Sequence, residues 1–331
     1  MEPWVEAWTR SANTFYSSQW PADHFATAPS HSTAVAEGLV HHLSYAIEHL
    51  HGGGYFGVID VCEVGGGDGT LMTQVLALAV QQHPAVEFRS RVIELRPRPP
   101  QLASTIEWIH GPMETHLPES IRGLIFAHEV LDDVPLTLAQ YDESLALRQV
   151  MVNPANGDEE LGEPVSANDG VWVSRWWPHQ SVGGRVEIGA TRDQVWAAIA
   201  STVSTGIAIA IDYAHTQEQR SLGSFALGTL TGFRHGYPCQ PVPDGSMNIT
   251  AHVALDACAV AAERACAPLP LTTVLVSQRD VLGVLDASTA PPQTPHDALF
   301  AIAQHSHREL ARDCSGFGAF TWLIHHIGMG R

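Results

Sequence analysis

Three glycines at alternate positions stand in the chemically most informative segment of the sequence. Gly65, Gly67 and Gly69 follow an apolar run that ends at Glu63, and they precede the segment 70–82. The run has the length of a buried parallel strand, and the following segment carries apolar residues at helical spacing. Glycines between a strand and a helix allow a tight turn and a close approach of the backbone to a ligand. The segment therefore predicts a strand, loop and helix that bind a cofactor.

The spacing of these glycines separates two nucleotide cofactors. The dinucleotide pattern GxGxxG, begun at Gly65, requires a glycine at position 70, where Thr70 stands. A GxGxG frame fits instead and favours a cofactor without a pyrophosphate, S-adenosyl-L-methionine, over NAD. A purely structural turn is the third alternative. We predict S-adenosyl-L-methionine, bound by Glu63 and by the glycines at 65, 67 and 69.

Side chains after the second and third predicted strands complete this cofactor site. Glu94 closes a strand at 87–95, where an acidic residue accepts hydrogen bonds from ribose hydroxyls in nucleotide-binding α/β folds. An exposed charge at a strand end is the alternative. Met113 and Glu114 follow a strand at 106–110, in a loop expected to flank an adenine ring. The methionine could equally fill the core.

Three carboxylates and a histidine follow the fourth predicted strand, at 123–127: His128, Glu129, Asp132 and Asp133. In an open parallel sheet, ligands bind beyond the carboxyl ends of the strands. Unpaired charge is costly to bury, so packing alone does not explain the cluster. It could orient a cationic or hydroxyl-bearing nucleophile, or take its proton. Capping of the next helix by one of the aspartates is the alternative.

The order of these elements predicts an α/β fold. Strands that alternate with helices imply a parallel, Rossmann-like sheet with right-handed crossovers. We divide the chain into an N-terminal segment that caps the cofactor site (1–50), the cofactor-binding core (51–140), a β-rich insertion (141–190) and the remainder of the core with substrate-side loops and C-terminal helices (191–331).

Further patterns complete the predicted secondary structure. Aromatic-rich turns are expected near the N-terminus, a strand-like stretch at 171–176 and two helical stretches at the C-terminus. The other predicted helices are 33–51, 70–82, 191–203 and 253–265, and the other strands are 206–213 and 272–277.

Composition excludes several classes of protein. The 331 residues are 45% hydrophobic and 16% charged, which is typical of a globular chain with a core. The formal net charge of −18 repels phosphate backbones, so we expect no nucleic-acid partner. It could attract a cationic substrate, although solubility is the simpler explanation. The chain has no lysine, which excludes a Walker P-loop and a pyridoxal phosphate enzyme.

Other classes are excluded by what the sequence does not contain. No apolar run reaches the roughly 18 residues of a membrane span, and the acidic N-terminus is unlike a signal peptide. We therefore expect a cytoplasmic protein without a membrane partner. The five scattered cysteines and 19 dispersed histidines predict neither a disulfide framework nor a metal site. The sequence leaves the oligomeric state open, with a homodimer among the options.

Seven motifs, in a consistent order, resemble the MidA-like family of S-adenosyl-L-methionine-dependent methyltransferases, which includes a mitochondrial complex I assembly factor. The family's EIGxGxGTLM signature resembles 63–72, and its NEFFDALP motif resembles 128–135. The others are GDFxTAPE at 23–30, which includes Thr27, the acidic strand end at 92–96, IDYG at 211–214, GTLRxYRxH at 228–235 and DITAHVDF at 248–255.

The resemblance implies a class I methyltransferase sheet of seven strands with extra segments. It implies S-adenosyl-L-methionine as cofactor, with Thr27 near it, and suggests a protein or peptide side chain as acceptor, because the mitochondrial member is an arginine methyltransferase. Five positions depart from the family motifs, mostly on the expected substrate side: His24, Ser30, His128, Ala214 and Asn248. We interpret this as a retained cofactor and an altered acceptor.

The resemblance also suggests roles in catalysis. Asp132 matches the aspartate of the family motif and is our candidate base or orienting group. Glu129 is the candidate for holding the acceptor or the methionine end of the cofactor. His128 is a further candidate base, because the unperturbed pKa of histidine lies near neutrality. His252 could line the pocket, and a structural role is equally open for both histidines.

Three functions remain open at this point. An enzyme that methylates arginine or another nitrogen of a peptide or protein is favoured by the acidic cluster and the acidic surface. A methyltransferase of a small molecule, at oxygen or nitrogen, is favoured by the departures from the family and by Trp172, Trp176 and Trp177, since aromatic walls suit compact ligands. Those tryptophans could also be core residues. The third is an assembly factor that binds the cofactor without turnover. An NAD-dependent oxidoreductase is a weaker fourth.

Overall fold

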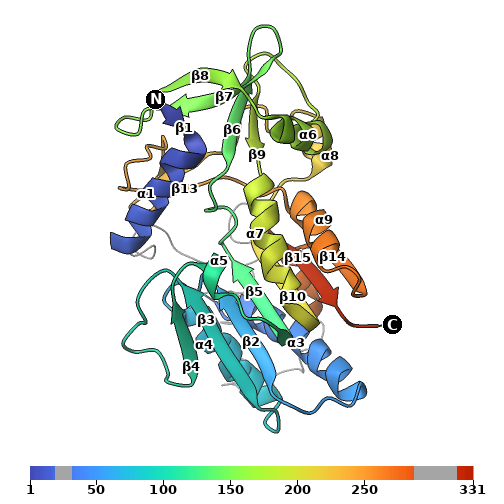
Figure 1. The fold of residues 1–331 in the computed structure, drawn as a ribbon. Coiled ribbons are helices and arrows are strands. Elements are labelled where there is room, and N and C mark those ends of the chain that lie inside the picture. Colours follow the sequence, from blue (N-terminus) through green and yellow to red (C-terminus); the bar gives the residue numbers. More distant parts are fainter. Residues whose placement is uncertain (19–31, 287–318, 331) are drawn as a thin grey trace. The chain divides into compact units, whose positions relative to one another are not determined.

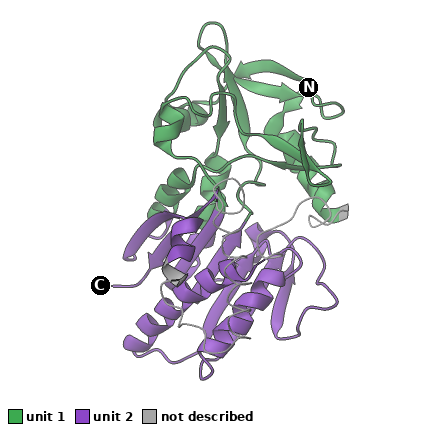
Figure 2. Cartoon of the chain, turned by 180° about the vertical axis from the view of Figure 1, so that it is seen from behind, with its two compact units in different colours: residues 1–26, 129–198, 212–264 green, residues 27–128, 199–211, 265–331 purple. Residues whose placement is uncertain are grey.

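The computed structural model describes residues 1–18, 32–286 and 319–330, and these form two compact units (Figure 2). Unit 1 comprises Met1–Ala26, Glu129–Ala198 and Asp212–Arg264, and unit 2 comprises Thr27–His128, Ile199–Ile211 and Ala265–Arg331. The segments expected from the sequence were consecutive, whereas each unit combines three separate stretches of chain. The chain therefore passes from unit 2 to unit 1 directly after the fourth strand of the predicted core.

Unit 2 contains a seven-stranded sheet in the order β14-β15-β10-β5-β2-β3-β4. The pairs β10–β5, β5–β2, β2–β3 and β3–β4 are parallel, and β14–β15 is antiparallel. This confirms the predicted Rossmann-like sheet. The strands are β2 (Ile59–Val64), β3 (Phe88–Glu94), β4 (Ile106–His110), β5 (Ile121–His128), β10 (Val203–Tyr213), β14 (Leu271–Ser277) and β15 (Phe320–Ile327).

The register of the sheet brings the predicted cofactor residues to one edge. Val64 of β2 pairs with Ile93 of β3 on one side and with Ala127 of β5 on the other. Glu94 is the next residue of β3 and pairs with His110 of β4. The carboxyl ends of these four strands therefore lie side by side, which is where open α/β sheets bind ligands.

The helices of unit 2 include the one predicted to follow the glycine loop. That helix, α4 (Thr70–Gln82), has the predicted bounds and packs against α3 (Ala34–Gly52), which also contacts β5. The others are α5 (Met113–His116) and α10 (Gln278–Asp286), and α10 contacts α3, β14 and β15. Of the predicted C-terminal helical stretches, α10 follows the predicted strand at 272–277, whereas the segment that contains His305 and His307 lies outside the described residues. Residues 320–327 form the buried strand β15, which the sequence did not predict. Its run of Trp322, Leu323 and Ile324 is fully buried, as expected of an inner strand rather than an amphipathic helix.

Unit 1 contains two antiparallel sheets. The larger has the order β1-β7-β6-β9, with β8 paired to β7, and the smaller has the order β12-β11-β13. The predicted insertion is therefore rich in strands. They are β1 (Glu2–Pro3), β6 (Thr137–Tyr141), β7 (Leu147–Val152), β8 (Glu159–Pro164), β9 (Arg185–Ile188), β11 (Thr231–Arg234), β12 (Tyr237–Cys239) and β13 (Asn248–Thr250).

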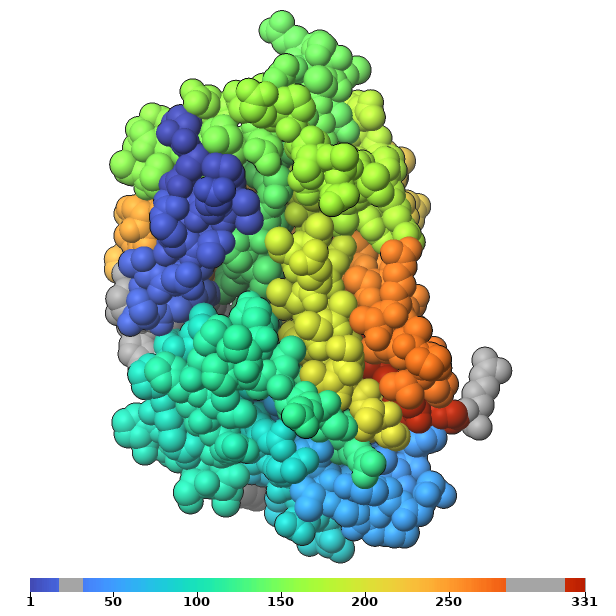
Figure 3. All heavy atoms as spheres, in the orientation of Figure 1, coloured from blue at the N-terminus to red at the C-terminus, as the bar shows by residue number. Residues whose placement is uncertain are grey.

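The N-terminal aromatic residues form a helix, not the turns expected from the sequence. In α1 (Trp4–Ser18), Trp4, Trp8 and Phe15 are almost fully buried. Their spacing places them on one face of a helix, so burial of that face stabilises the helical conformation. The helix packs against β6, β7 and β13 and forms the blue strip on the face shown in Figure 3.

The stretch 171–176 was expected to be strand-like and is instead part of α6 (Ala167–Trp176). Ser166 caps the helix by accepting a hydrogen bond from the backbone N–H of Asp169, a cap that the sequence interpretation overlooked. Trp172, Trp176 and Trp177 all lie in the hydrophobic core of unit 1. They are core residues, so they no longer support an aromatic wall for a small ligand.

Three further helices belong wholly or mainly to unit 1: α7 (Ala190–Ser201), α8 (Gln217–Ser221) and α9 (Leu255–Ala265), visible in Figure 1. The first and last correspond to predicted helices. Among the described residues, no helix is both long and apolar enough to cross a bilayer. Thr27 and the motif around it lie outside the described residues.

Candidate functional site

The glycine loop of unit 2 has a backbone that requires glycine at each position of the predicted frame. Gly65, Gly67 and Gly69 have φ angles of 72°, 59° and 81°, in the left-handed region that other residues rarely adopt. Gly66 is needed for packing, because a Cβ atom there would lie 2.2 Å from Cγ1 of Val92. At Gly67, by contrast, a Cβ atom would meet nothing closer than 3.9 Å. The loop is therefore packed against the sheet on one side and open at Gly67.

Glu94 is held at the edge of this loop. Its Oε2 accepts a 2.8 Å hydrogen bond from the backbone N–H of Gly67. Its Oε1 accepts hydrogen bonds of 3.2 Å from both the backbone N–H and the Nε of Arg96. Glu94 and Arg96 are 6% and 7% exposed. A carboxylate can accept about four hydrogen bonds, so capacity remains for hydroxyl donors.

Glu63 lies beneath the same loop, fully inside the protein. Burial, and secondly the negative charge of Glu94, raise the pKa of Glu63 to about 8. Its Oε2 has no hydrogen-bond partner and lies 3.3 Å from where a Cβ atom on Gly66 would stand. An orphaned carboxyl oxygen and an open glycine fit a nucleoside cofactor that carries hydrogen-bond donors and positive charge.

The loop after β4 returns to the same edge, because the backbone N–H of Gly111 donates to the carbonyl of Glu94 at 2.9 Å. Met113 begins α5 nearby and is half-buried, whereas Glu114 is exposed. The structure thus brings Met113 towards the predicted cofactor edge and leaves Glu114 at the surface. Both assignments stay predictions.

His128 ends β5 in unit 2 and is only 7% exposed. Its ring lies against that of Phe320, with the centroids 5.6 Å apart. Burial lowers the pKa of His128 to about 4, so the ring is neutral at pH 7 and a weaker base than its type suggests.

Glu129 begins the second stretch of unit 1 and has a φ angle of 53°, a left-handed conformation that costs energy for a residue with a Cβ atom. Burial and the nearby Asp132 raise the pKa of Glu129 well above its usual range. Strained backbone at a half-buried carboxylate is typical of functional sites.

Asp132 differs from Asp133 and Asp212, since its Oδ1 is buried without a hydrogen-bond partner. Burial raises the pKa of Asp132 to about 6, although the charge of Arg192 opposes the shift. Asp212, at the end of β10, is fully partnered. Its Oδ2 accepts from the backbone N–H groups of Leu131 (2.9 Å) and Asp132 (3.2 Å), and its Oδ1 accepts from that of Tyr213 (3.0 Å). Asp212 therefore shapes the loop that presents Asp132.

Arg192 of α7 joins this loop to the segment that carries His252. The guanidinium is 1% exposed and donates to the carbonyl of Asp132 at 2.6 Å and to that of His252 at 3.0 Å. It also donates to the carbonyls of Val134 and Ala251. One buried cation thus holds two predicted catalytic residues that are 120 positions apart in the sequence.

His252 is held by two further contacts. Its backbone N–H donates to Oγ1 of Thr229 at 2.8 Å, and that hydroxyl donates to Oε2 of the buried Glu187 at 2.6 Å. Its ring stacks on Tyr213, with centroids 5.9 Å apart and an angle of 20°. The Nδ1 of His252 has no hydrogen-bond partner, as for Oδ1 of Asp132. The cluster in unit 1 therefore combines orphaned polar atoms with a backbone that is firmly held.

Asp133, unlike Asp132, has both carboxylate oxygens in hydrogen bonds. Its carboxylate accepts hydrogen bonds from the hydroxyl of Tyr16 and, at 3.1 Å, from the Nδ2 of Asn248. This contact explains one departure from the family motif, since an aspartate at 248 would repel Asp133. Helix capping, the alternative considered for the cluster, does not describe it.

Sequence reasoning missed three residues of these two sites: Arg96, Arg192 and Asp212. Arg96 and Asp212 lie within motifs that were matched, so their positions carried a signal. Arg192 had none, because its partners are backbone carbonyls whose location depends on the tertiary fold.

The sequence profile of a family described as "Putative S-adenosyl-L-methionine-dependent methyltransferase" matches residues 45–271. The chain belongs to this family. It is a methyltransferase that uses S-adenosyl-L-methionine, as the glycine frame predicted. A search of curated protein sequences finds no match.

Solved structures support the fold assignment. A COG1565 superfamily member from Burkholderia thailandensis, bound to S-adenosyl-homocysteine, is 20% identical, with a TM-score of 0.79 over 99% of this chain and 88% of that one. A second crystal structure of a COG1565 superfamily protein from the same organism gives a TM-score of 0.77 at 20% identity, with the same coverage. At this identity the likeness concerns the fold, which is a methyltransferase fold.

Proposed function

We propose that this methyltransferase transfers its methyl group to a guanidinium nitrogen of an arginine side chain in a peptide or protein. The observation that carries the proposal is the buried, unpartnered Oδ1 of Asp132 in a cluster with Glu129 and Asp212. Among the described residues, the positive charge that acts on Asp132 and Asp212 is that of Arg192. A cationic acceptor would compensate the remaining negative charge, which is costly to bury unpaired.

The same carboxylate can manage the proton of the reaction. The cofactor supplies an activated methyl group when bound, so the protein must align the acceptor and remove one proton. An acceptor N–H that donates to Oδ1 of Asp132 is oriented by that bond, and its proton passes to Asp132 once the new N–C bond forms. Glu129 would hold the cationic acceptor, and Arg192 keeps the loop of Asp132 in place.

The proposal also assigns the cofactor-binding residues of unit 2. We propose that Glu63, Gly65, Gly67 and Gly69 line the cofactor and that Glu94 accepts hydrogen bonds from its ribose hydroxyls. The predicted contribution of Met113, Glu114 and Thr27 belongs to the same proposal. Support comes from the glycine backbone, the open space at Gly67 and the shared sheet edge.

A methyl-transfer assay tests the proposal. The protein is incubated with radiolabelled S-adenosyl-L-methionine and with matched peptides that carry arginine, citrulline or lysine at one position. We expect methylated arginine only, and its loss in Asp132→Asn. Asp133→Asn is the matched control, because both oxygens of Asp133 are already used within unit 1.

Other results would redirect the proposal. Methylation of hydroxylated or amine-bearing small molecules, with no arginine product, would favour the small-molecule alternative. Saturable S-adenosyl-homocysteine binding without turnover on any acceptor would favour an assembly factor.

A further inference from the structure

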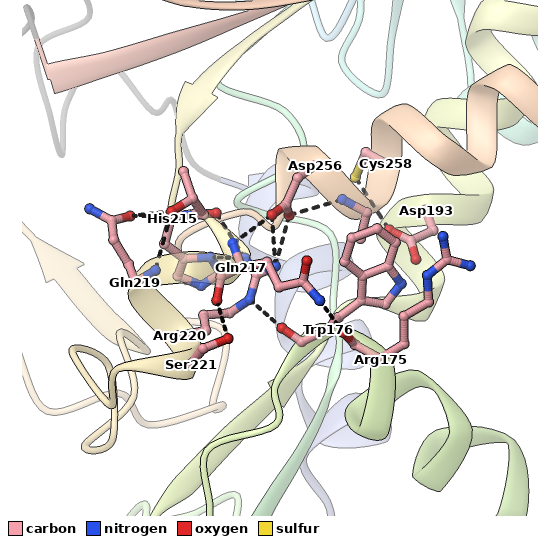
Figure 4. A network of polar contacts seen from close by, with 12 residues as sticks. Arg175, Trp176, Asp193, His215, Gln217, Gln219, Arg220, Ser221, Asp256 and Cys258 are labelled. Carbon is pink, nitrogen blue, oxygen red and sulfur yellow. Dashed lines mark hydrogen bonds and ion pairs between the residues drawn. The ribbon is translucent and has the colours of Figure 1, made fainter.

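A second histidine of unit 1, His215, has a tautomer that its neighbours determine. Arg220 of α8 is fully buried and donates from Nη1 to Nδ1 of His215 at 2.8 Å (Figure 4). Because a guanidinium can only donate, Nδ1 must accept, and the ring proton must lie on Nε2. Burial and the charge of Arg220 lower the pKa of His215 well below its usual range, which keeps the ring neutral.

Arg220 is itself firmly fixed. Its Nη2 donates to both oxygens of Asp256 at 2.8 and 3.0 Å, and its Nε donates to the carbonyl of Trp176 at 2.7 Å. Asp256 also accepts a 2.6 Å hydrogen bond from the backbone N–H of Gln217, as Figure 4 shows. The pairing of Arg220 with His215 is therefore built into the unit rather than a surface contact.

The Nε2 of His215 is a buried donor without an acceptor. The side chain is 2% exposed, and Nε2 has no hydrogen-bond partner. An unpaired buried N–H is costly, so native proteins rarely keep one without a water or a ligand to receive it. Its rotation is limited by the rings of Trp177 and Phe225, whose centroids lie 5.1 and 4.8 Å away. The donor therefore has a fixed direction.

This donor stands beside the residues of the proposed acceptor site. The ring centroids of His215 and His252 are 6.4 Å apart. The backbone N–H of His215 donates to the carbonyl of Val253 at 3.2 Å, and that of Val253 donates to the carbonyl of Tyr213 at 2.8 Å. The backbone N–H of Ala251 donates to the carbonyl of Asp132 at 3.1 Å. Three adjacent backbone segments of unit 1 thus carry the orphaned atoms of Asp132, His215 and His252.

Of the two rings that limit the rotation of His215, Phe225 is half-buried and Trp177 is buried. It lies between Gly223 and Gly228, both with left-handed φ angles of 75° and 76°. The flanking Leu222 and Leu227 are 75% and 88% exposed. Phe225 thus limits rotation of the ring in the free protein, and an acceptor that reaches Nε2 from this side would have to take its place.

We propose that the Nε2–H of His215 binds a carbonyl oxygen of the methyl acceptor and so selects a peptide over a free guanidinium compound. The inference rests on the proposed arginine acceptor, because the carbonyl is then that of the peptide backbone next to the methylated side chain. The neutral Nε2–H donor suits the uncharged carbonyl oxygen of the peptide, whereas the carboxylates Asp132 and Glu129 would bind the guanidinium of the arginine.

Nitrogen NMR of protein with 15N-labelled histidine rings tests this directly. The Nε2–H signal of His215 is assigned by its absence in His215→Asn. The probes are N-acetyl-arginine N-methylamide, which has a guanidinium and carbonyls, agmatine, which has only the guanidinium, and N-methylacetamide, which has only the carbonyl. We expect the first and third to shift the signal, and agmatine to leave it unchanged.

Each other result has a defined meaning. A signal that no probe shifts means that Nε2 binds only a structural water, and overturns the inference. An equal shift with agmatine overturns the carbonyl contact. If the carbonyl probes shift the signal but no arginine peptide is methylated, the proposed arginine acceptor is wrong. The carbonyl contact of His215 is then still supported.

Two substitutions separate a binding role from a structural one. His215→Asn can keep an acceptor for Arg220 but lacks the distal donor, whereas His215→Gln can place an amide N–H near the position of Nε2. We expect His215→Asn to raise KM for N-acetyl-arginine N-methylamide about 10-fold with kcat within about twofold, as for loss of one buried hydrogen bond. His215→Gln should keep KM close to the wild-type value. Equal loss in both variants, or a change in kcat alone, contradicts the role in binding.

Discussion

The two sites of this enzyme are built in different ways. The proposed cofactor site of unit 2 consists of one short loop and of strand ends that the sheet aligns, with Glu94 only 27 residues from Gly67. The acidic cluster of unit 1 joins segments near positions 130, 190, 213 and 252, and depends on one buried arginine. The first is determined by backbone conformation, the second by compensation of charge and hydrogen bonds. Damage to one should therefore leave the other largely intact.

Replacement of Arg192 should have the largest effect. Arg192→Met removes the hydrogen bonds of Arg192 to the carbonyls of Asp132 and His252 and the cation near Asp132 and Asp212. Breaking such a buried arrangement costs roughly 3–5 kcal/mol of unfolding free energy. We expect unit 1 to unfold early in chemical denaturation and methyl transfer to be lost.

Calorimetric titration with S-adenosyl-homocysteine completes this experiment. Affinity should stay within a few-fold of the wild type if the two sites are independent. Arg148→Met is the matched control, because Arg148 pairs with Asp142 at the surface, with its side chain 37% exposed, and should change stability by less than about 1 kcal/mol. Loss of cofactor binding in Arg192→Met would contradict the comparison.

Asp132 should control turnover with little effect on the cofactor. Asp132→Asn removes the proposed base, for which losses of roughly 10²–10⁴-fold are typical. Because the pKa of Asp132 is raised to about 6, the carboxylate is ionised above that pH, and kcat/KM of the wild type should fall as the pH drops through 6. The residual kcat/KM of Asp132→Asn should not show this fall near pH 6. An unchanged pH profile would remove Asp132 from the base role.

Gly67→Val is the converse change, aimed at unit 2. A β-branched residue at a φ angle of 59° is strained by about 1–2 kcal/mol, and its side chain enters the open space of the loop. We expect S-adenosyl-homocysteine binding to weaken by about 100-fold or more, with unit 1 still folded by tryptophan fluorescence. Gly52→Val is the control, since a Cβ atom there meets nothing within 4 Å. Retained affinity would remove the glycine-loop assignment.

Glu63 should make the stability of unit 2 depend on pH. The folded state keeps the proton of Glu63 up to a pKa of about 8, whereas the unfolded chain releases it near 4.5. Its contribution to the free energy of unfolding is thus fully present below pH 4.5 and lost as the pH rises towards 8. We expect the difference between wild type and Glu63→Gln to change by on the order of 5 kcal/mol across this window, since each pKa unit corresponds to about 1.4 kcal/mol. A constant difference in urea unfolding curves would contradict the raised pKa.

Glu114 should matter least. It is exposed in α5, so Glu114→Ala is expected to change the affinity for S-adenosyl-homocysteine by less than about threefold. A loss comparable to that of Gly67→Val, measured by the same titration, would show that the loop after β4 binds the cofactor more closely than its exposure indicates.

Local patterns predicted unit 2 better than unit 1. The apolar run before Glu63, the glycines and the helical spacing of 70–82 are neighbours in sequence, and α4 was predicted residue by residue. In unit 1, Trp4 and Trp172 stand in stretches whose helical form depends on a core assembled from distant strands, and these were predicted as turns and strand. The strand β15 was missed for the same reason, because a buried run of this length is ambiguous until its partner β14 is known.

The sequence by itself determined the cofactor class, because the spacing of Gly65, Gly67 and Gly69 can be read from residue type alone. These are the positions at which the loop backbone adopts φ angles that other residues rarely tolerate. The sequence also identified Asp132 and His252 as candidates. Only the tertiary structure decided which polar atoms remain without partners, since Arg192, Asp212 and Arg220 reach their carbonyls, amides and ring nitrogen across long separations in the chain. Charge compensation in a buried site depends on distance in space, and residue order does not encode that distance directly.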